Sequence, residues 1–82
     1  MEMADFAKVI VDNMRGERAR RRLTQHELGQ RVGWSRQVVW QIEIGARSLK
    51  VDELPALCRA LDVSLSELAR GADPEDLGAL RV

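Results

Sequence analysis

Residues 24–45, with the sequence TQHELGQRVGWSRQVVWQIEIG, carry the signals for two short helices separated by a tight turn. Thr24 and Glu27 match the T-x-x-E capping box, in which each side chain bonds a backbone N–H group of the other residue. A helix is therefore predicted to begin just after Thr24. Gly33 is predicted to end it, because glycine adopts the positive φ of such a turn without steric cost. Ser35 is the next predicted N-cap, so a second helix follows at once.

Helical patterns continue along the rest of the chain. It contains only two prolines and six glycines, and it lacks the alternation of apolar and polar residues that is typical of strands. The predicted helices span residues 4–21, 25–32, 36–44, 51–61 and 64–71. Ser64 caps the last of these and forms a second predicted capping box with Glu67. Apolar positions in the first, fourth and fifth of these predict one shared core, made by Phe6, Val9, Ile10, Met14, Leu54, Leu57, Leu61, Val63, Leu65 and Leu68.

The expected fold class is therefore all-α, a compact five-helix domain. The domain is expected to cover residues 1–72, since 82 residues suit a single core. Residues 73–82 are interpreted as a short C-terminal tail that either takes part in dimerisation or is disordered. The apolar residues of this tail, and so the candidates for a dimer contact, are Leu77, Leu80 and Val82.

Charge is distributed unevenly, although the formal net charge is zero. Residues 1–50 contain ten Lys/Arg and six Asp/Glu, a net charge of +4. Residues 51–82 contain three and seven, a net charge of −4. Such a chain can present a basic face to phosphate groups. Chance alone also produces uneven charge in small helical proteins.

Composition disfavours several classes of protein. No run of 18 apolar residues is present, and the N-terminus lacks a basic-then-apolar signal pattern, so we expect a cytoplasmic protein that does not span a membrane. One histidine, His26, and one cysteine, Cys58, are too few for a standard structural zinc site. His26 is expected to be solvated and Cys58 to be a buried, inert thiol. We expect no enzyme activity, no cofactor and no metal.

The predicted helix over residues 36–44 has two different faces. Residues follow one another around a helix at about 100°. One arc then collects Arg36, Gln37, Trp40, Gln41 and Ile44. The opposite arc is apolar and contains Val38, Val39 and Ile42. Glu43 falls between the two arcs. In the alternative, a rotated helix would place Trp40 in the core.

The polar arc has the chemistry that reads base pairs in a DNA major groove. Arginine matches the two acceptors of guanine, and glutamine matches the acceptor and donor of adenine. Arg36, Gln37, Trp40 and Gln41 are therefore the candidate base contacts. An exposed tryptophan needs an apolar partner, which could be a thymine methyl group, a sugar or another protein chain.

Phosphate contacts are expected on both sides of this helix. Gln25, at the start of its helix, can offer a side-chain amide and a backbone N–H group to one phosphate, aided by the helix dipole. The full set of candidate phosphate contacts is Thr24, Gln25, Ser35, Arg47 and Lys50. The run of three arginines at residues 20–22 either joins them or complements the negative C-terminus of the first helix.

The segment resembles the Xre family of helix-turn-helix proteins, which includes phage repressors and Cro. The resemblance covers about residues 10–70. It rests on Arg18, Leu23-Thr24-Gln25, Glu27-Leu28-Gly29, Gly33-Trp34-Ser35, Ile42-Glu43-Ile44-Gly45 and the ALDVSLSEL sequence of Ala60–Leu68. It implies a five-helix domain that binds double-stranded operator DNA, usually as a homodimer.

The same resemblance assigns roles to individual residues. It implies that Gln25 clamps a phosphate and that Arg36, Gln37 and Gln41 read bases. It also implies a structural ion pair between Arg18 and Glu43, joining the first helix to the third.

The chain departs from the family pattern at four places. Gly29 replaces the usual alanine, which is expected only to lower helix propensity. Arg22 stands where a glycine often ends the first helix, so either the connection differs or Arg22 is forced into a left-handed conformation. Leu49-Lys50 replaces a frequent proline, and Trp40 is bulky for a residue that faces the groove.

Two functions remain in competition. The first is transcriptional regulation, expected to be repression because a bare DNA-binding domain can block a promoter unaided. The second is a protein-interaction module on the same fold, such as an antitoxin or a polymerase-binding partner.

Overall fold

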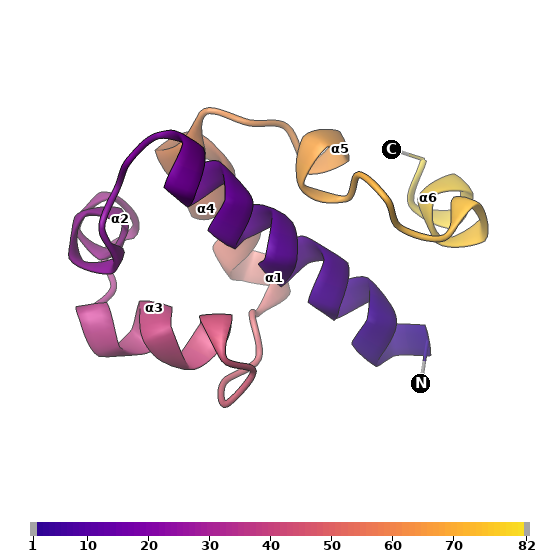
Figure 1. Ribbon diagram of the computed structural model, residues 1–82. Helices are drawn as coiled ribbons and strands as arrows, with labels where there is room; N and C mark the ends of the chain where they lie inside the picture. The colour runs from indigo at the N-terminus through magenta and orange to yellow at the C-terminus, as the bar shows by residue number, and fades with distance from the viewer. Residues whose placement is uncertain (1, 82) are drawn as a thin grey trace.

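Helix α1 (Glu2–Arg20) crosses the molecule diagonally, and the other helices are arranged around it (Figure 1). The computed structural model describes residues 2–81, and the surroundings of side chains from Phe6 onward. Every regular element in that range is helical, which confirms the all-α class. The remaining elements are α2 (Gln25–Val32), α3 (Arg36–Glu43), the 3₁₀ turn η1 (Val51–Glu53), α4 (Leu54–Leu61), α5 (Leu65–Leu68) and α6 (Pro74–Leu80).

A single apolar core lies between α1 and the helices that follow it. α1 contacts α3, α4 and α5, while α2 packs against α3 and α4. The largest side chains that are fully buried there are Met14, Leu28, Val39, Ile42, Leu57, Leu61 and Leu68. Four residues expected in the core, Phe6, Val9, Leu54 and Leu65, are only partly buried, and Phe6, Leu54 and Leu65 pack against its edge.

Both predicted capping boxes are present. The backbone N–H of Glu27 donates to the Thr24 hydroxyl over 3.0 Å, and the backbone N–H of Thr24 donates to the Glu27 carboxylate over 2.8 Å. Ser64 and Glu67 exchange the same two bonds at the start of α5. Gly33 follows α2 with a φ of 94°, the left-handed conformation predicted for it. These local signals therefore set where α2 and α5 begin and where α2 ends.

Two predicted helices are shorter than expected. The one predicted over residues 51–61 begins as the 3₁₀ turn, and α4 follows with Pro55 in its first turn, where a missing N–H group costs no bond. The one predicted over residues 64–71 ends at Leu68. There the Asn13 amide of α1 donates to the carbonyl oxygens of Leu68, over 2.6 Å, and Arg70, over 2.9 Å. Asn13 thus ties α1 to the end of α5.

The segment interpreted as a tail forms a sixth helix, α6. Asp73 caps it by accepting the Glu75 N–H over 2.8 Å, and Pro74 occupies its first position. Of the three dimer candidates, Leu77 is half-buried against the core of its own domain, Leu80 is 50% exposed, and Val82 lies outside the described residues. The sequence contains the residues that begin this helix, Asp73 and Pro74, but it does not show that Leu77 packs against the core.

Gly29 is required by the turn between α2 and α3. A Cβ atom at this position would lie 2.5 Å from the backbone oxygen of Trp34, closer than real Cβ contacts come. The backbone N–H groups of Gly33 and Trp34 both donate to the Gly29 carbonyl over 2.8 Å, which draws the turn onto the helix. The expectation that Gly29 only lowers helix propensity was therefore wrong, because its missing side chain allows this close approach.

Arg22 adopts the left-handed conformation, with a φ of 55°, that was one of two alternatives for it. The N–H groups of Arg22 and Leu23 donate to the carbonyls of Ala19 and Arg18, over 3.0 and 3.1 Å. This pair of bonds is the Schellman motif, which ends a helix and favours glycine at the position of Arg22. Both hydrogen bonds of the motif are thus formed, although Arg22 and not glycine occupies the left-handed position.

Replacing Arg22 by glycine should raise the free energy of unfolding by about 1 kcal/mol, because the left-handed conformation is costly for every residue with a Cβ atom. Urea denaturation followed by circular dichroism measures this. The matched control is Gln30→Gly, on the exposed side of α2 in ordinary helical geometry, which should lose about 1 kcal/mol. A loss of stability in Arg22→Gly would contradict the interpretation.

Candidate nucleic-acid interface

The outer face of α3 is polar, with two exposed apolar residues. Arg36 and Gln37 are exposed, and Gln41 is half-buried beside them. Trp40 is 47% exposed and Ile44 is 55% exposed. The opposite arc is directed into the core, with Val39 and Ile42 fully buried and Val38 partly buried. The helix therefore has the rotation predicted from its sequence, and Trp40 is a surface residue.

A hollow lies where the first turns of α2 and α3 come together. Its volume is about 460 Å³, and it is lined by Gln25, Ser35, Arg36, Gln37 and Trp40. The first N–H groups of a helix have no partner inside the helix, and the dipole makes this end attractive to anions. Two predicted phosphate contacts, Gln25 and Ser35, and three predicted base contacts thus share one concave surface.

The two capping hydroxyl groups of this site already hold their helices in place. The Thr24 oxygen accepts the N–H of Glu27, and the Ser35 oxygen accepts the N–H of Val38 over 3.2 Å. A hydroxyl group that accepts a bond can still donate its own hydrogen. Each of these side chains can therefore cap its helix and donate to a phosphate oxygen at the same time.

Glu43 connects the site to the rest of the domain. Its carboxylate, 3% exposed, accepts two bonds from the Arg18 guanidinium, with N···O distances of 2.7 and 3.1 Å. The Gln25 side-chain amide donates to the same carboxylate over 3.0 Å, and Nε of Arg15 lies 3.9 Å from it. Arg18 also donates to the Leu23 carbonyl over 2.9 Å. One buried carboxylate thus joins α1, α2 and α3.

The bond from Gln25 was not anticipated. The sequence analysis predicted a phosphate contact for Gln25 and an ion pair with Arg18 for Glu43. Gln25 and Glu43 are eighteen residues apart, and this spacing does not predict a contact between them. The half-buried amide still has a second N–H group and an oxygen available. Its contact with Glu43 holds the side chain beside the start of α2, where it faces the hollow.

Replacing Glu43 by glutamine should lower the free energy of unfolding by about 3 kcal/mol, because it leaves the largely buried Arg18 without a counter-charge. Urea denaturation at neutral pH measures the loss. Asp12→Asn is the matched control: it breaks an ion pair with Lys8 whose side chains are 73% and 51% exposed, so it should cost only a small fraction of that. Equal stability of Glu43→Gln and wild type would refute the structural role.

Arg47 is engaged within the domain and does not face the hollow. Its guanidinium makes two bonds to the Glu53 carboxylate, over 3.0 and 2.7 Å, and one to the Ser48 carbonyl over 3.1 Å. It also lies 5.8 Å from the ring centre of Trp34, within cation–π range. The Lys50 N–H donates to Glu53 over 2.8 Å. The guanidinium that was predicted to contact a phosphate is thus bound to Glu53 in a clasp, and this clasp fastens the loop in which the frequent proline is missing.

This clasp makes the domain sensitive to acid. The two bonds from Arg47 lower the pKa of Glu53 from 4.5 to about 2. A carboxylate whose pKa is lowered by folding stabilises the folded state above the unfolded pKa, and this contribution is lost as the pH falls toward the folded pKa.

Glu53→Gln should therefore lose part of the stability difference that wild type shows between pH 7 and pH 3. Urea midpoints at several pH values between these limits measure it. Asp52→Asn, which changes the exposed neighbouring carboxylate, should keep the wild-type pH dependence. If Glu53→Gln follows the wild-type curve at every pH, the clasp does not contribute as described.

The arginines at the end of α1 are partly neutralised by the domain itself. The buried Glu17 carboxylate forms ion pairs with Arg20 and Arg21, and the Arg21 guanidinium also donates to the Glu17 carbonyl over 3.2 Å. The hydrogen bond from Arg21, helped by Arg20, lowers the pKa of Glu17. Two residues of this basic run thus complete the end of α1.

The part of the chain that the structure describes contains no group of side chains suited to a metal ion and no helix suited to span a membrane. Among those residues, no three His, Cys, Asp or Glu side chains gather as a metal ion would need. None of the described helices combines the length and apolar character required to cross a membrane. Cys58 is half-buried at the edge of the core, and burial raises the pKa of its thiol.

The comparisons with known proteins identify one family. A family model described as a helix-turn-helix domain matches residues 11–71, which include α2, α3 and the turn between them. Members of this family are typically regulators that bind DNA and have no enzyme activity. No curated protein and no solved structure matches the chain.

Proposed function

Because this chain belongs to the helix-turn-helix domain family, we propose that it binds double-stranded DNA sequence-specifically, as a transcriptional regulator of the Xre and Cro-like type. The observation that carries the proposal is the outer face of α3, which exposes an arginine and glutamines beside the first turn of α2. In such domains the second helix of the motif enters the major groove and its N-terminal residues reach base edges.

Arg36, Gln37 and Gln41 are the proposed readers of base identity. A guanidinium pairs with the O6 and N7 atoms of guanine, and a side-chain amide pairs with the N6 and N7 atoms of adenine. Arg36 and Gln37 stand in the first turn of α3, and Gln41 follows Gln37 by one turn of the same face. We therefore propose that the three span neighbouring base pairs.

Thr24, Gln25, Ser35 and Lys50 are the proposed phosphate contacts. The first three surround the first turns of α2 and α3, and Lys50 is exposed in the loop between α3 and α4. Such contacts set the register of α3 without reading sequence themselves. Arg47 has no part in this set, since Glu53 holds its guanidinium.

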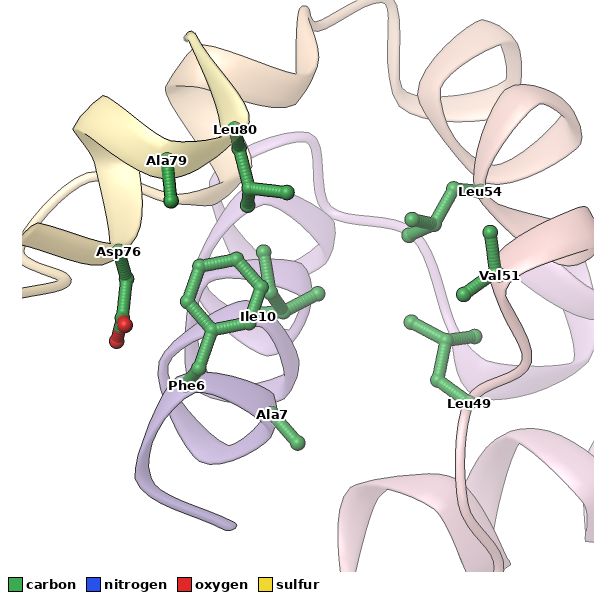
Figure 2. Close-up of a pocket in the computed structure, with 9 residues that line it drawn as sticks. All are labelled: Phe6, Ala7, Ile10, Leu49, Val51, Leu54, Asp76, Ala79 and Leu80. Atoms are coloured by element: carbon green, nitrogen blue, oxygen red, sulfur yellow. The ribbon is translucent and has the colours of Figure 1, made fainter. Parts of the chain in front are cut away.

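We also propose a homodimer, with the second copy seated in an apolar groove between α1, the loop before α4, and α6 (Figure 2). The groove has a volume of about 440 Å³, and two of its residues, Val51 at 83% and Leu80 at 50%, are strongly exposed. The domain measures 34 × 24 × 22 Å. Two copies of this size are compatible with half-sites one turn of DNA apart, about 34 Å. Bound in this way across a promoter, the dimer would act as a repressor.

Selection of bound duplexes from a random DNA library at moderate salt tests the proposal. An enriched inverted repeat, with half-sites about one helical turn apart, is the expected result. Arg36→Ala should then relax the preference at one position of each half-site, at a cost of about 1–3 kcal/mol in binding. Lys50→Ala should weaken binding to all sequences and reduce its salt dependence.

The matched control for charge is Lys8→Ala, on the exposed surface of α1 outside the proposed interface, which should leave the selected sequence unchanged. Failure to enrich any sequence, together with a lack of salt-dependent binding, would overturn the proposal. The exposed Trp40 and Ile44 would then favour the alternative, a protein-interaction module in which another chain covers this face.

A further inference from the structure

We infer that Trp40 contacts the C5-methyl group of a pyrimidine in the major groove. Strong binding then requires one such methyl group in each half-site of the operator. The inference rests on the proposed function and extends it. It starts from an exposed indole, 47% accessible, in the middle of a helix face that also carries Ile44 and three hydrogen-bonding residues, Arg36, Gln37 and Gln41.

This side chain is not part of the apolar core. Core contacts of α3 come from Val39 and Ile42, which are fully buried on the opposite arc. The indole instead forms one wall of the hollow between the starts of α2 and α3. Because it follows Arg36 by four residues and Gln37 by three, it lies next to both on the same face of the helix. Its neighbours in the hollow are therefore two proposed base readers, Arg36 and Gln37, and two proposed phosphate contacts, Gln25 and Ser35.

The largest apolar group on a base edge in the major groove is the C5-methyl group of thymine. Guanine, adenine and cytosine present hydrogen-bonding atoms there and, besides these, only small ring C–H groups. In methylated DNA, 5-methylcytosine presents the same methyl group at the same atom. An indole placed among base readers buries the most apolar surface against this methyl group, so the methyl group is the partner that its chemistry favours.

The neighbouring glutamine supports the same assignment. A glutamine that pairs with adenine selects an A·T pair, and the methyl group of the paired thymine then faces the same groove. Gln37 and Trp40 thus have complementary preferences for the same pair or for adjacent pairs.

Replacement of thymine by deoxyuridine tests the inference, because it removes only the methyl group and keeps the pairing. The probe is the duplex selected with wild-type protein, in which each thymine is replaced in turn. At one position per half-site the wild-type affinity should fall about fourfold, the value expected for one buried methyl group. Trp40→Ala should bind the thymine and uracil duplexes equally, and Trp40→Phe should keep most of the discrimination.

A second pair of duplexes separates the methyl group from the rest of the base. At the sensitive position, a 5-methylcytosine·guanine pair should bind wild-type protein better than a cytosine·guanine pair, and Trp40→Ala should lose that difference. Repeating the selection with a library that carries 5-methylcytosine shows which pyrimidine supplies the methyl group. Urea denaturation of Trp40→Ala should match wild type, since the residue lies outside the core.

The outcomes distinguish this inference from the function on which it rests. If Trp40→Ala keeps the wild-type affinity and sequence preference while Arg36→Ala relaxes one position, the methyl contact is refuted and the DNA-binding function stands. If neither uracil nor 5-methylcytosine changes wild-type binding at any position, the contact is again refuted, whatever affinity Trp40→Ala retains. A protein that binds no duplex refutes both.

Discussion

The buried Glu43 carboxylate is the contact on which the arrangement of α1, α2 and α3 depends. Helices α2 and α3 have only eight residues each, too short to be stable alone, so their geometry comes from their partners. Glu43 accepts bonds from Arg18 of α1 and Gln25 of α2 while it belongs to α3. A buried charge is costly unless its bonds are made, and here those bonds can be made only when all three helices are in place.

This dependence links the core of the domain to its surface. The Gln25 side-chain amide donates one hydrogen bond to Glu43, and the residue lines the hollow beside Ser35 and Arg36. The close approach of the Trp34 backbone to Gly29 draws the turn against α2, and Arg47 and Glu53 close the loop on the other side of α3. Contacts before and after α3 thus hold this helix in a fixed position. A fixed position suits the proposed binding of base edges by its outer face.

Reasoning from the sequence worked best where the determining interactions are local. The capping boxes at Thr24 and Ser64 and the positive φ of Gly33 involve residues within a few positions of each other, so the sequence pattern contains the whole interaction. The period of α3 predicted which residues face outward, because apolar side chains select the buried arc of a short amphipathic helix. Arg22 shows the limit of such reasoning: two conformations were open to it, and only the Schellman bonds of the folded chain selected one.

The sequence by itself therefore determined the helical class, the limits of α2, the rotation of α3 and the residues exposed on its outer face, since all of these follow from short-range geometry and burial. Only the tertiary structure decided the partner of Arg47, the bond between Gln25 and Glu43, the need for glycine at position 29, and the packing of α6 beside an apolar groove. In each case the residues that meet are not related by the repeat of a helix or a strand. Their contacts depend on how whole helices pack, and no local pattern encodes that.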